Sequence, residues 1–158
     1  MSDSTPPRRG LYFEEFAEGE SYTTVGRTIG EADVTQFAGL SGDFNSLHTD
    51  AVYAAAGDFG QRVAHGLLVL SIASGLAVRT GIMEGTVMAF REINDWKFTR
   101  PVYFGDTIHV RLTTESLKAF PRLGGGAIVL GVDVINQDDQ SVMRGRWTML
   151  VRSRPEGG

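Results

Sequence analysis

The feature that most restricts the fold of this chain is an apolar segment at its centre, residues 67–80, which predicts a helix with no polar face. A helix that is hydrophobic all round is buried, either in a protein core or in a membrane. Its most apolar part, residues 67–78, is too short to cross a bilayer and contains Ser71, Ser74 and Gly75. The helix would be about 21 Å long. We therefore expect a buried central helix of a size that a curved sheet can surround.

After this segment the sequence changes to the patterns of β-strands. Four segments are rich in β-branched and aromatic residues: 87–98, 107–116, 127–136 and 141–152. Alternation within the second of them places Ile108, Val110 and Leu112 inward and His109 outward. An out-of-phase Ile93 predicts a β-bulge in the first. We expect these four strands to be antiparallel, with the last two joined as a hairpin.

Shorter elements are expected before the central helix: a strand at 22–29, a helix at 28–39, and a short helix at 51–56 that Asp50 caps. Strands and helices in separate runs are typical of an α+β domain. A length of 158 residues suits one domain. We expect that domain to span 11–153, with a disordered N-terminal tail at 1–10 and a frayed C-terminal tail at 154–158.

The charge and cysteine content exclude several classes of function. The net charge of −4 gives no electrostatic footprint for nucleic acid. The chain has no cysteine, which excludes disulfides and thiolate sites and fits a cytoplasmic protein. The N-terminal residues lack the apolar region of a signal peptide. We therefore expect a cytoplasmic protein whose partners include neither nucleic acid nor membrane.

The chemistry of the chain is concentrated in residues 40–50. Asp43, Asn45 and His48 place a carboxylate, an amide and an imidazole within six residues, and Leu47 can anchor the segment by packing inward. A polar cluster braced by apolar neighbours is typical of a loop site. The alternative interpretation is a helix cap followed by surface residues, because Asp and Asn are common caps.

A second stretch, residues 63–70, places His65 and Gly66 directly before the apolar segment. Together the two stretches resemble the MaoC-like dehydratases, the family that includes the (R)-specific enoyl-CoA hydratases. The positions that match its pattern are Gly42, Asp43, Asn45, Leu47, His48, Ala64, His65 and Gly66. One position departs, because Ser46 stands where the family usually has Pro. The resemblance is specific over Phe37 to Ser74 and looser beyond.

The resemblance implies a hot-dog fold, in which an antiparallel β-sheet is wrapped around a buried central α-helix. It also implies hydration of a trans-2-enoyl-CoA to an (R)-3-hydroxyacyl-CoA, or the reverse dehydration, at a site built on a dimer interface. A sheet of this size leaves an edge strand that a second copy can protect. We therefore expect a homodimer or a higher assembly of dimers.

This reaction requires proton transfer to and from water and stabilisation of charge on the thioester oxygen. Asp43 and His48 suit the first task jointly, because a carboxylate and an imidazole can share one water. Gly66 suits the second, since free amides at the start of a helix favour negative charge. We expect these three as the catalytic residues, with no metal and no cofactor beyond the coenzyme A of the acyl-CoA thioester substrate.

Substrate contacts are expected at five further positions: Asn45, His65, Arg79, Lys97 and Arg100. The three cations among them are candidates for coenzyme A phosphates. Each of the five also has a simpler interpretation: Asn45 orients the loop, His65 is a hydrogen-bonded structural histidine, and the cations are exposed charges.

Two other functions remain open at this point. One is a hot-dog acyl-CoA thioesterase; many of these carry an acidic residue within the central helix, as the resemblance to that wider group implies, and residues 67–78 contain none. The other is a non-catalytic acyl-binding module, against which the presence of Asp43, His48 and Gly66 argues.

Overall fold

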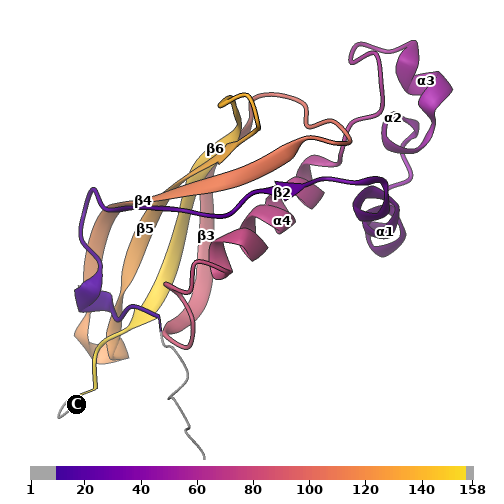
Figure 1. The fold of residues 1–158 in the computed structure, drawn as a ribbon. Coiled ribbons are helices and arrows are strands. Elements are labelled where there is room, and N and C mark those ends of the chain that lie inside the picture. Colours follow the sequence, from indigo (N-terminus) through magenta and orange to yellow (C-terminus); the bar gives the residue numbers. More distant parts are fainter. Residues whose placement is uncertain (1–9, 156–158) are drawn as a thin grey trace, which may run out of the picture.

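The computed structural model describes residues 10–155, and these form an antiparallel sheet curved around one helix (Figure 1). Of the tails expected at 1–10 and 154–158, residues 1–9 and 156–158 fall outside the described residues. Arg154 is not frayed, because its amide donates to the Glu14 carboxylate and its guanidinium to that of Glu15, both at 3.0 Å. Gly10, at the edge of the first, is buried, and its amide donates a hydrogen bond to the Glu84 carbonyl at 2.6 Å.

The helices and strands follow one another in the order η1 (Phe13–Glu15), β1 (Ser21–Thr23), β2 (Arg27–Thr28), α1 (Glu31–Ser41), α2 (Ser46–Thr49), α3 (Ala51–Ala55), α4 (Gly66–Val78), β3 (Val87–Phe98), β4 (Thr107–Phe120), η2 (Pro121–Leu123), β5 (Gly125–Ile135) and β6 (Ser141–Arg152). The predicted α+β order, with four long strands after the central helix, is therefore confirmed.

The sheet has the strand order β1-β4-β5-β6-β3, and β2 also pairs with β4. All pairings are antiparallel. The alternation expected in β4 is confirmed, because Ile108, Val110 and Leu112 are each 0% exposed. The bulged character of β3 is confirmed too, with register shifts on both sides of Ile93. β3 forms one edge of the sheet and has no partner on its outer side among the described residues.

Helix α4 is the predicted central helix, but its burial is not uniform. Val69 and Ala73 are 0% exposed and pack into the core that the sheet surrounds. Leu67 is 61% exposed and Val78 51% exposed, and Ser71 lies exposed between them. These three positions follow helical spacing along the side of α4 that faces away from the sheet. One chain therefore leaves an apolar stripe of its central helix open.

Two short elements differ from the sequence prediction. The expected strand at 22–29 is divided into β1 and β2, because Thr24 uses its hydroxyl as well as its amide to bond Val110. Helix α2 was not expected, and local bonding explains it. The Asn45 side chain accepts a hydrogen bond from the Leu47 amide at 3.0 Å and starts a single helical turn.

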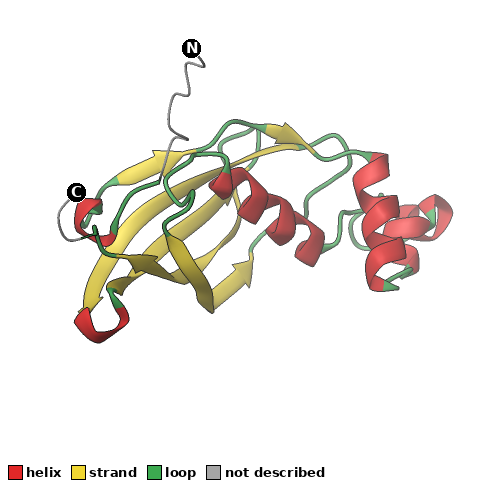
Figure 2. Cartoon of the chain, turned by 90° about the horizontal axis from the view of Figure 1, so that it is seen from below, coloured by secondary structure: helices red, strands yellow, loops and turns green. Residues whose placement is uncertain are grey.

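Helices α1, α2 and α3 lie together beyond one end of the sheet (Figures 1 and 2). Arg62, in the segment between α3 and α4, donates two hydrogen bonds to the carboxylate of Glu31 at 2.8 and 2.7 Å. These bonds lower the pKa of Glu31 below its usual range. The Arg62 guanidinium also lies 4.5 Å over the Phe104 ring. The pair ties this group of helices to the sheet. None of the described helices is long and apolar enough to cross a membrane.

Candidate active site

The loop that carries Asp43 begins where α1 ends. Gly42 adopts the left-handed conformation, with φ of 77°, and its amide donates to the Ala38 carbonyl at 2.8 Å. A side chain at this position would be strained, so glycine permits the sharp exit from the helix. The side-chain carboxylate of Asp43 accepts a hydrogen bond from the backbone amide of Asn45 at 3.2 Å. The side-chain oxygen of Asn45 in turn accepts from the backbone amide of Leu47, so Asn45 holds the loop in shape.

His48 lies on α2 with one ring nitrogen committed to the backbone. Its Nδ1 is 2.7 Å from the carbonyl oxygen of Val63. A carbonyl can only accept a hydrogen bond, so Nδ1 carries the proton in the neutral ring. The lone pair is then on Nε2. A fixed tautomer with a free lone pair is the form that a general base requires.

His65 joins the same group from the residue that precedes α4. It is 3% exposed, and its Nε2 lies 2.9 Å from the backbone oxygen of Asp43. Its ring stacks on that of His48, with centroids 3.8 Å apart and an angle of 30° between the planes. Potential ligand atoms of Asp43, His48 and His65 all lie within 4.8 Å of one another. The structure therefore brings together one carboxylate and two imidazoles from three segments.

This group has the residue types of a metal site, but its geometry suits proton transfer better. One nitrogen of each ring faces a backbone carbonyl, so each imidazole has a single nitrogen left as a possible ligand. A shared ion would need His48 Nε2, the buried Nδ1 of His65 and Asp43 to converge on one point. Proton transfer needs only Asp43 and His48 Nε2.

Gly66 is the first residue of α4, and no described residue accepts a hydrogen bond from its amide. The ring of Phe98, at the end of β3, covers its Cα: an added Cβ would lie 2.7 Å from Phe98 Cε1. A side chain at position 66 would therefore have to displace the Phe98 ring, which is 54% exposed. Both residues line a cavity of about 550 Å³ together with Leu47, His48, Phe59, Val63, Ala64, Leu67, Thr99, Arg100, Pro101, Val102 and Met143.

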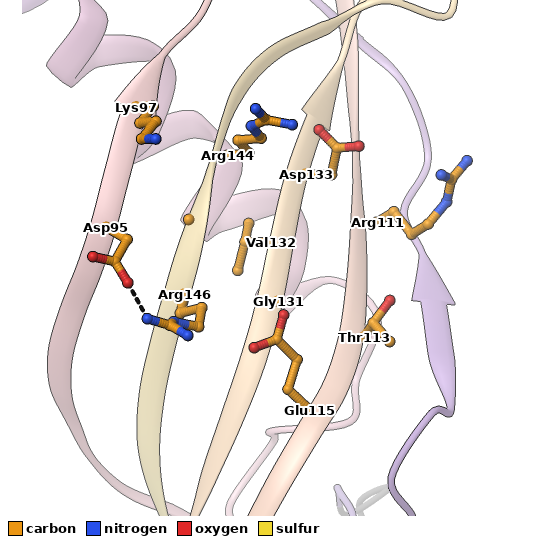
Figure 3. Close-up of a pocket in the computed structure, with 11 residues that line it drawn as sticks. Asp95, Lys97, Arg111, Thr113, Glu115, Gly131, Val132, Asp133, Arg144 and Arg146 are labelled. Carbon is orange, nitrogen blue, oxygen red and sulfur yellow. Dashed lines mark hydrogen bonds and ion pairs between the residues drawn. The ribbon is translucent and has the colours of Figure 1, made fainter.

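The structure places the three predicted cations in different regions. Arg100 lines the same cavity as His48 and Gly66. Lys97 lies on the face of the sheet away from α4, in a hollow of about 630 Å³ rimmed by Asp95, Arg144 and Arg146 (Figure 3). Arg79 lies beyond the other end of α4 from Gly66. A single chain therefore brings Arg100, but neither Arg79 nor Lys97, to the cavity. A contact with substrate at any of these positions remains a prediction.

Sequence reasoning missed the apolar walls of the cavity, above all Phe98. The available signal was Phe98 followed by Pro101 and Val102, which belongs to the looser part of the family resemblance. Nothing in the spacing of residues 66 and 98 indicated that the ring lies on the glycine, because this contact depends on how β3 crosses the start of α4.

Replacement of Ser46 by proline is expected to stabilise the loop. Ser46 is the first residue of α2, where proline is favoured, and no described residue accepts a hydrogen bond from its amide. Asn45, with ψ of 134°, already has the extended conformation that precedes proline. Ser46→Pro should raise the free energy of unfolding by about 0.4–1 kcal/mol, measured by thermal and urea denaturation. A lower stability would mean that the loop follows another path in solution.

Comparisons with known proteins agree with this geometry. The family model of the MaoC like domain matches residues 14–130. The MaoC protein of Klebsiella aerogenes is 46% identical over 104 residues, which cover 66% of this chain but only 30% of that protein. The (R)-specific enoyl-CoA hydratase of Rhodospirillum rubrum is 35% identical over 106 residues, covering 67% of this chain and 71% of the hydratase.

Solved structures are similar over most of the chain. A monoamine oxidase regulatory protein from Archaeoglobus fulgidus matches with a TM-score of 0.87 at 35% identity, covering 94% of this chain and 98% of that one. A Mycobacterium tuberculosis protein with a double hot-dog fold matches with a TM-score of 0.82 at 21% identity, covering 94% and 46%. The second shows the fold alone, and the predicted hot-dog architecture is confirmed. With a family model that covers most of its length, the chain belongs to the MaoC-like dehydratase family.

Proposed function

We propose that this chain hydrates a trans-2-enoyl-CoA to an (R)-3-hydroxyacyl-CoA, or catalyses the reverse dehydration. The observation that carries the proposal is the approach of Asp43 and His48 beside a mostly apolar cavity that starts at the free amide of Gly66. The stereochemistry rests on the resemblance and on the printed name of the Rhodospirillum relative.

Three groups divide the chemistry. Asp43 and the Nε2 lone pair of His48 hold one water, and the pair removes a proton from it as its oxygen bonds to Cβ of the substrate. The pair then returns a proton to Cα, so one water is added across the double bond. Negative charge that develops on the thioester oxygen is stabilised by the Gly66 amide and the helix dipole. Loss of one such donor costs about 3–4 kcal/mol in well-studied enzymes.

The lining of the cavity suits an acyl-CoA substrate. Apolar side chains such as Leu67, Phe98 and Met143 line the cavity and suit an acyl chain. Arg100 lines the same cavity, which supports the proposal that it meets a coenzyme A phosphate. Since proton transfer and charge stabilisation need only side chains and amides, we propose no cofactor other than the coenzyme A of the substrate. A cytoplasmic location is part of the same proposal and rests on the absence of cysteine.

One assay separates this function from its alternatives. Purified protein is mixed with a panel of trans-2-enoyl-CoA thioesters, and loss of enoyl absorbance is followed beside release of free thiol. A hydratase removes the absorbance without releasing thiol. A thioesterase releases thiol, and an acyl-binding module does neither. Chiral analysis of the hydroxyacyl product then tests the (R) configuration.

We further propose that the chain acts as a homodimer paired along β3. This free edge exposes three large apolar side chains: Phe90 at 43%, Ile93 at 45% and Phe98 at 54%. An open hydrophobic edge favours pairing with another strand. Phe98 also lines the cavity, so a partner on β3 would lie against the open side of the site.

Sedimentation velocity tests the assembly directly. The wild type is expected to sediment as a dimer, or an assembly of dimers, of the 17.2 kDa chain. Ile93→Lys should shift it to monomer, because a charge would replace an apolar side chain that the paired edge buries. Val25→Lys is the matched control, since Val25 is 57% exposed at the opposite side of the sheet. An active wild-type monomer at micromolar concentration would refute this pairing.

A further inference from the structure

His65 carries a buried nitrogen that the proposed reaction does not use. The residue is 3% exposed, and its Nδ1 has no hydrogen-bond partner among the described residues. Burial of an unpaired polar atom is unfavourable, whereas a phenylalanine would fill a similar volume without that penalty. An unsatisfied buried group therefore calls for a role that an apolar ring cannot perform.

The other nitrogen of the ring shows what that role involves. Nε2 lies 2.9 Å from the Asp43 carbonyl oxygen, which only accepts, so Nε2 bears the hydrogen. The neutral ring consequently has its lone pair on Nδ1. The ring of Phe37 is also close, with its centroid 5.0 Å from that of His65. His65 is thus held in one tautomer by its bond to the Asp43 backbone.

The ring also connects the two residues of the proposed acid–base pair. Its Nε2 donates a hydrogen bond to the backbone carbonyl of Asp43. The face of the same ring packs against the ring of His48, with centroids 3.8 Å apart. Asp43 and His48 are the titratable groups that meet it, since the third neighbour is Phe37. The ring of His65 thus lies against both members of the pair that is proposed to hold the water.

We propose that His65 is a positioning residue that fixes the backbone of Asp43 and supports the ring of His48. This inference rests on the proposed hydratase function for its kinetic consequences. It differs from a contact with substrate, because the Nε2 and the face of the buried ring are both occupied by other residues of the protein. The inference also predicts that the two imidazoles are held in opposite tautomers. This part can be tested without any substrate.

The chain has three histidines, which makes nitrogen NMR of the full-length protein labelled in histidine a direct test. In the neutral rings, His48 should show hydrogen on Nδ1 and His65 hydrogen on Nε2. Loss of a signal in His48→Ala, His65→Phe or His109→Gln assigns each ring. A neutral His65 ring with its hydrogen on Nδ1 would overturn the proposal.

Two variants then separate the hydrogen bond of His65 to Asp43 from its stacking on His48. His65→Gln keeps an amide donor for the Asp43 carbonyl and loses the stack, whereas His65→Phe keeps the stack and loses the donor. Each should lower kcat at least about tenfold, since small displacements of reacting groups are costly, while KM changes little. In His65→Gln, the nitrogen spectrum of His48 should also change, because the ring loses the imidazole on which it stacks while its bond to the Val63 carbonyl remains. The matched control, His109→Gln on β4, should keep both kcat and the His48 spectrum.

The outcomes distinguish this inference from the proposed function. A lower melting temperature with unchanged kcat in both variants would reduce His65 to a structural residue and overturn the inference. If the wild type hydrates no enoyl-CoA, the proposed reaction is wrong. In that case the spectra still decide whether His65 supports the ring of His48, because they require no turnover.

Discussion

Asp43→Asn and His48→Ala should each lower the turnover of an enoyl-CoA at least about a hundredfold, in line with the contribution of general acid–base groups. Asparagine keeps the shape of Asp43 but cannot accept a proton. Alanine removes the Nε2 lone pair that the bond from Nδ1 to the Val63 carbonyl leaves free. Because both groups act on the same water, the double variant should be little worse than either single one.

The measurement is the initial rate of enoyl absorbance change, with folding confirmed by melting temperature. Asp58→Asn and His109→Gln are matched controls for each residue type, because Asp58 is exposed and His109 lies on β4, away from the cavity. Turnover near that of the wild type in a folded Asp43 or His48 variant would remove that residue from the mechanism.

Val69→Asp is expected to abolish folding. Val69 is 0% exposed in the middle of the core around α4. No described cation lies in that core to pair with a carboxylate. An unpaired buried charge costs several kcal/mol, which is comparable with the total stability of about 5–15 kcal/mol that a domain has.

Far-UV circular dichroism and thermal unfolding of the refolded variant measure this effect. Ser71→Asp, two residues along the same helix but exposed, is the matched control and should melt close to the wild type. The pair tests the orientation of α4 and not merely its helicity. If Val69→Asp melted like the wild type while Ser71→Asp did not fold, the assignment of the two sides of α4 would be reversed.

The sequence predicted the orientation of side chains best where one face of a strand or helix is buried and the other is exposed to solvent. In β4, alternation placed Ile108, Val110 and Leu112 correctly, because a strand changes face at every residue. Helix α4 offered no such contrast. Its apolar residues on every side predicted burial, but they gave no indication of which side the sheet would leave open.

The candidate site could be located because its residues are local in sequence. Asp43 and His48 are five positions apart, and His65 and Gly66 are adjacent. Lys97 could not be placed in this way, because a register shift between Asn94 and Lys97 changes which face of β3 its side chain meets. The stacking of His65 on His48 joins segments that only the fold brings together.

The position of Phe98 gives β3 two properties at once: it is an open edge of the sheet and a wall of the cavity. If a strand that pairs with this edge moves the Phe98 ring, it changes the affinity of the cavity for its ligand. Linkage makes the effect reciprocal, so a ligand that binds more tightly to the paired form strengthens the pairing by the same factor. Binding isotherms measured at different protein concentrations would then differ. Dilution of the protein would separate the paired chains and so weaken the apparent affinity for such a ligand.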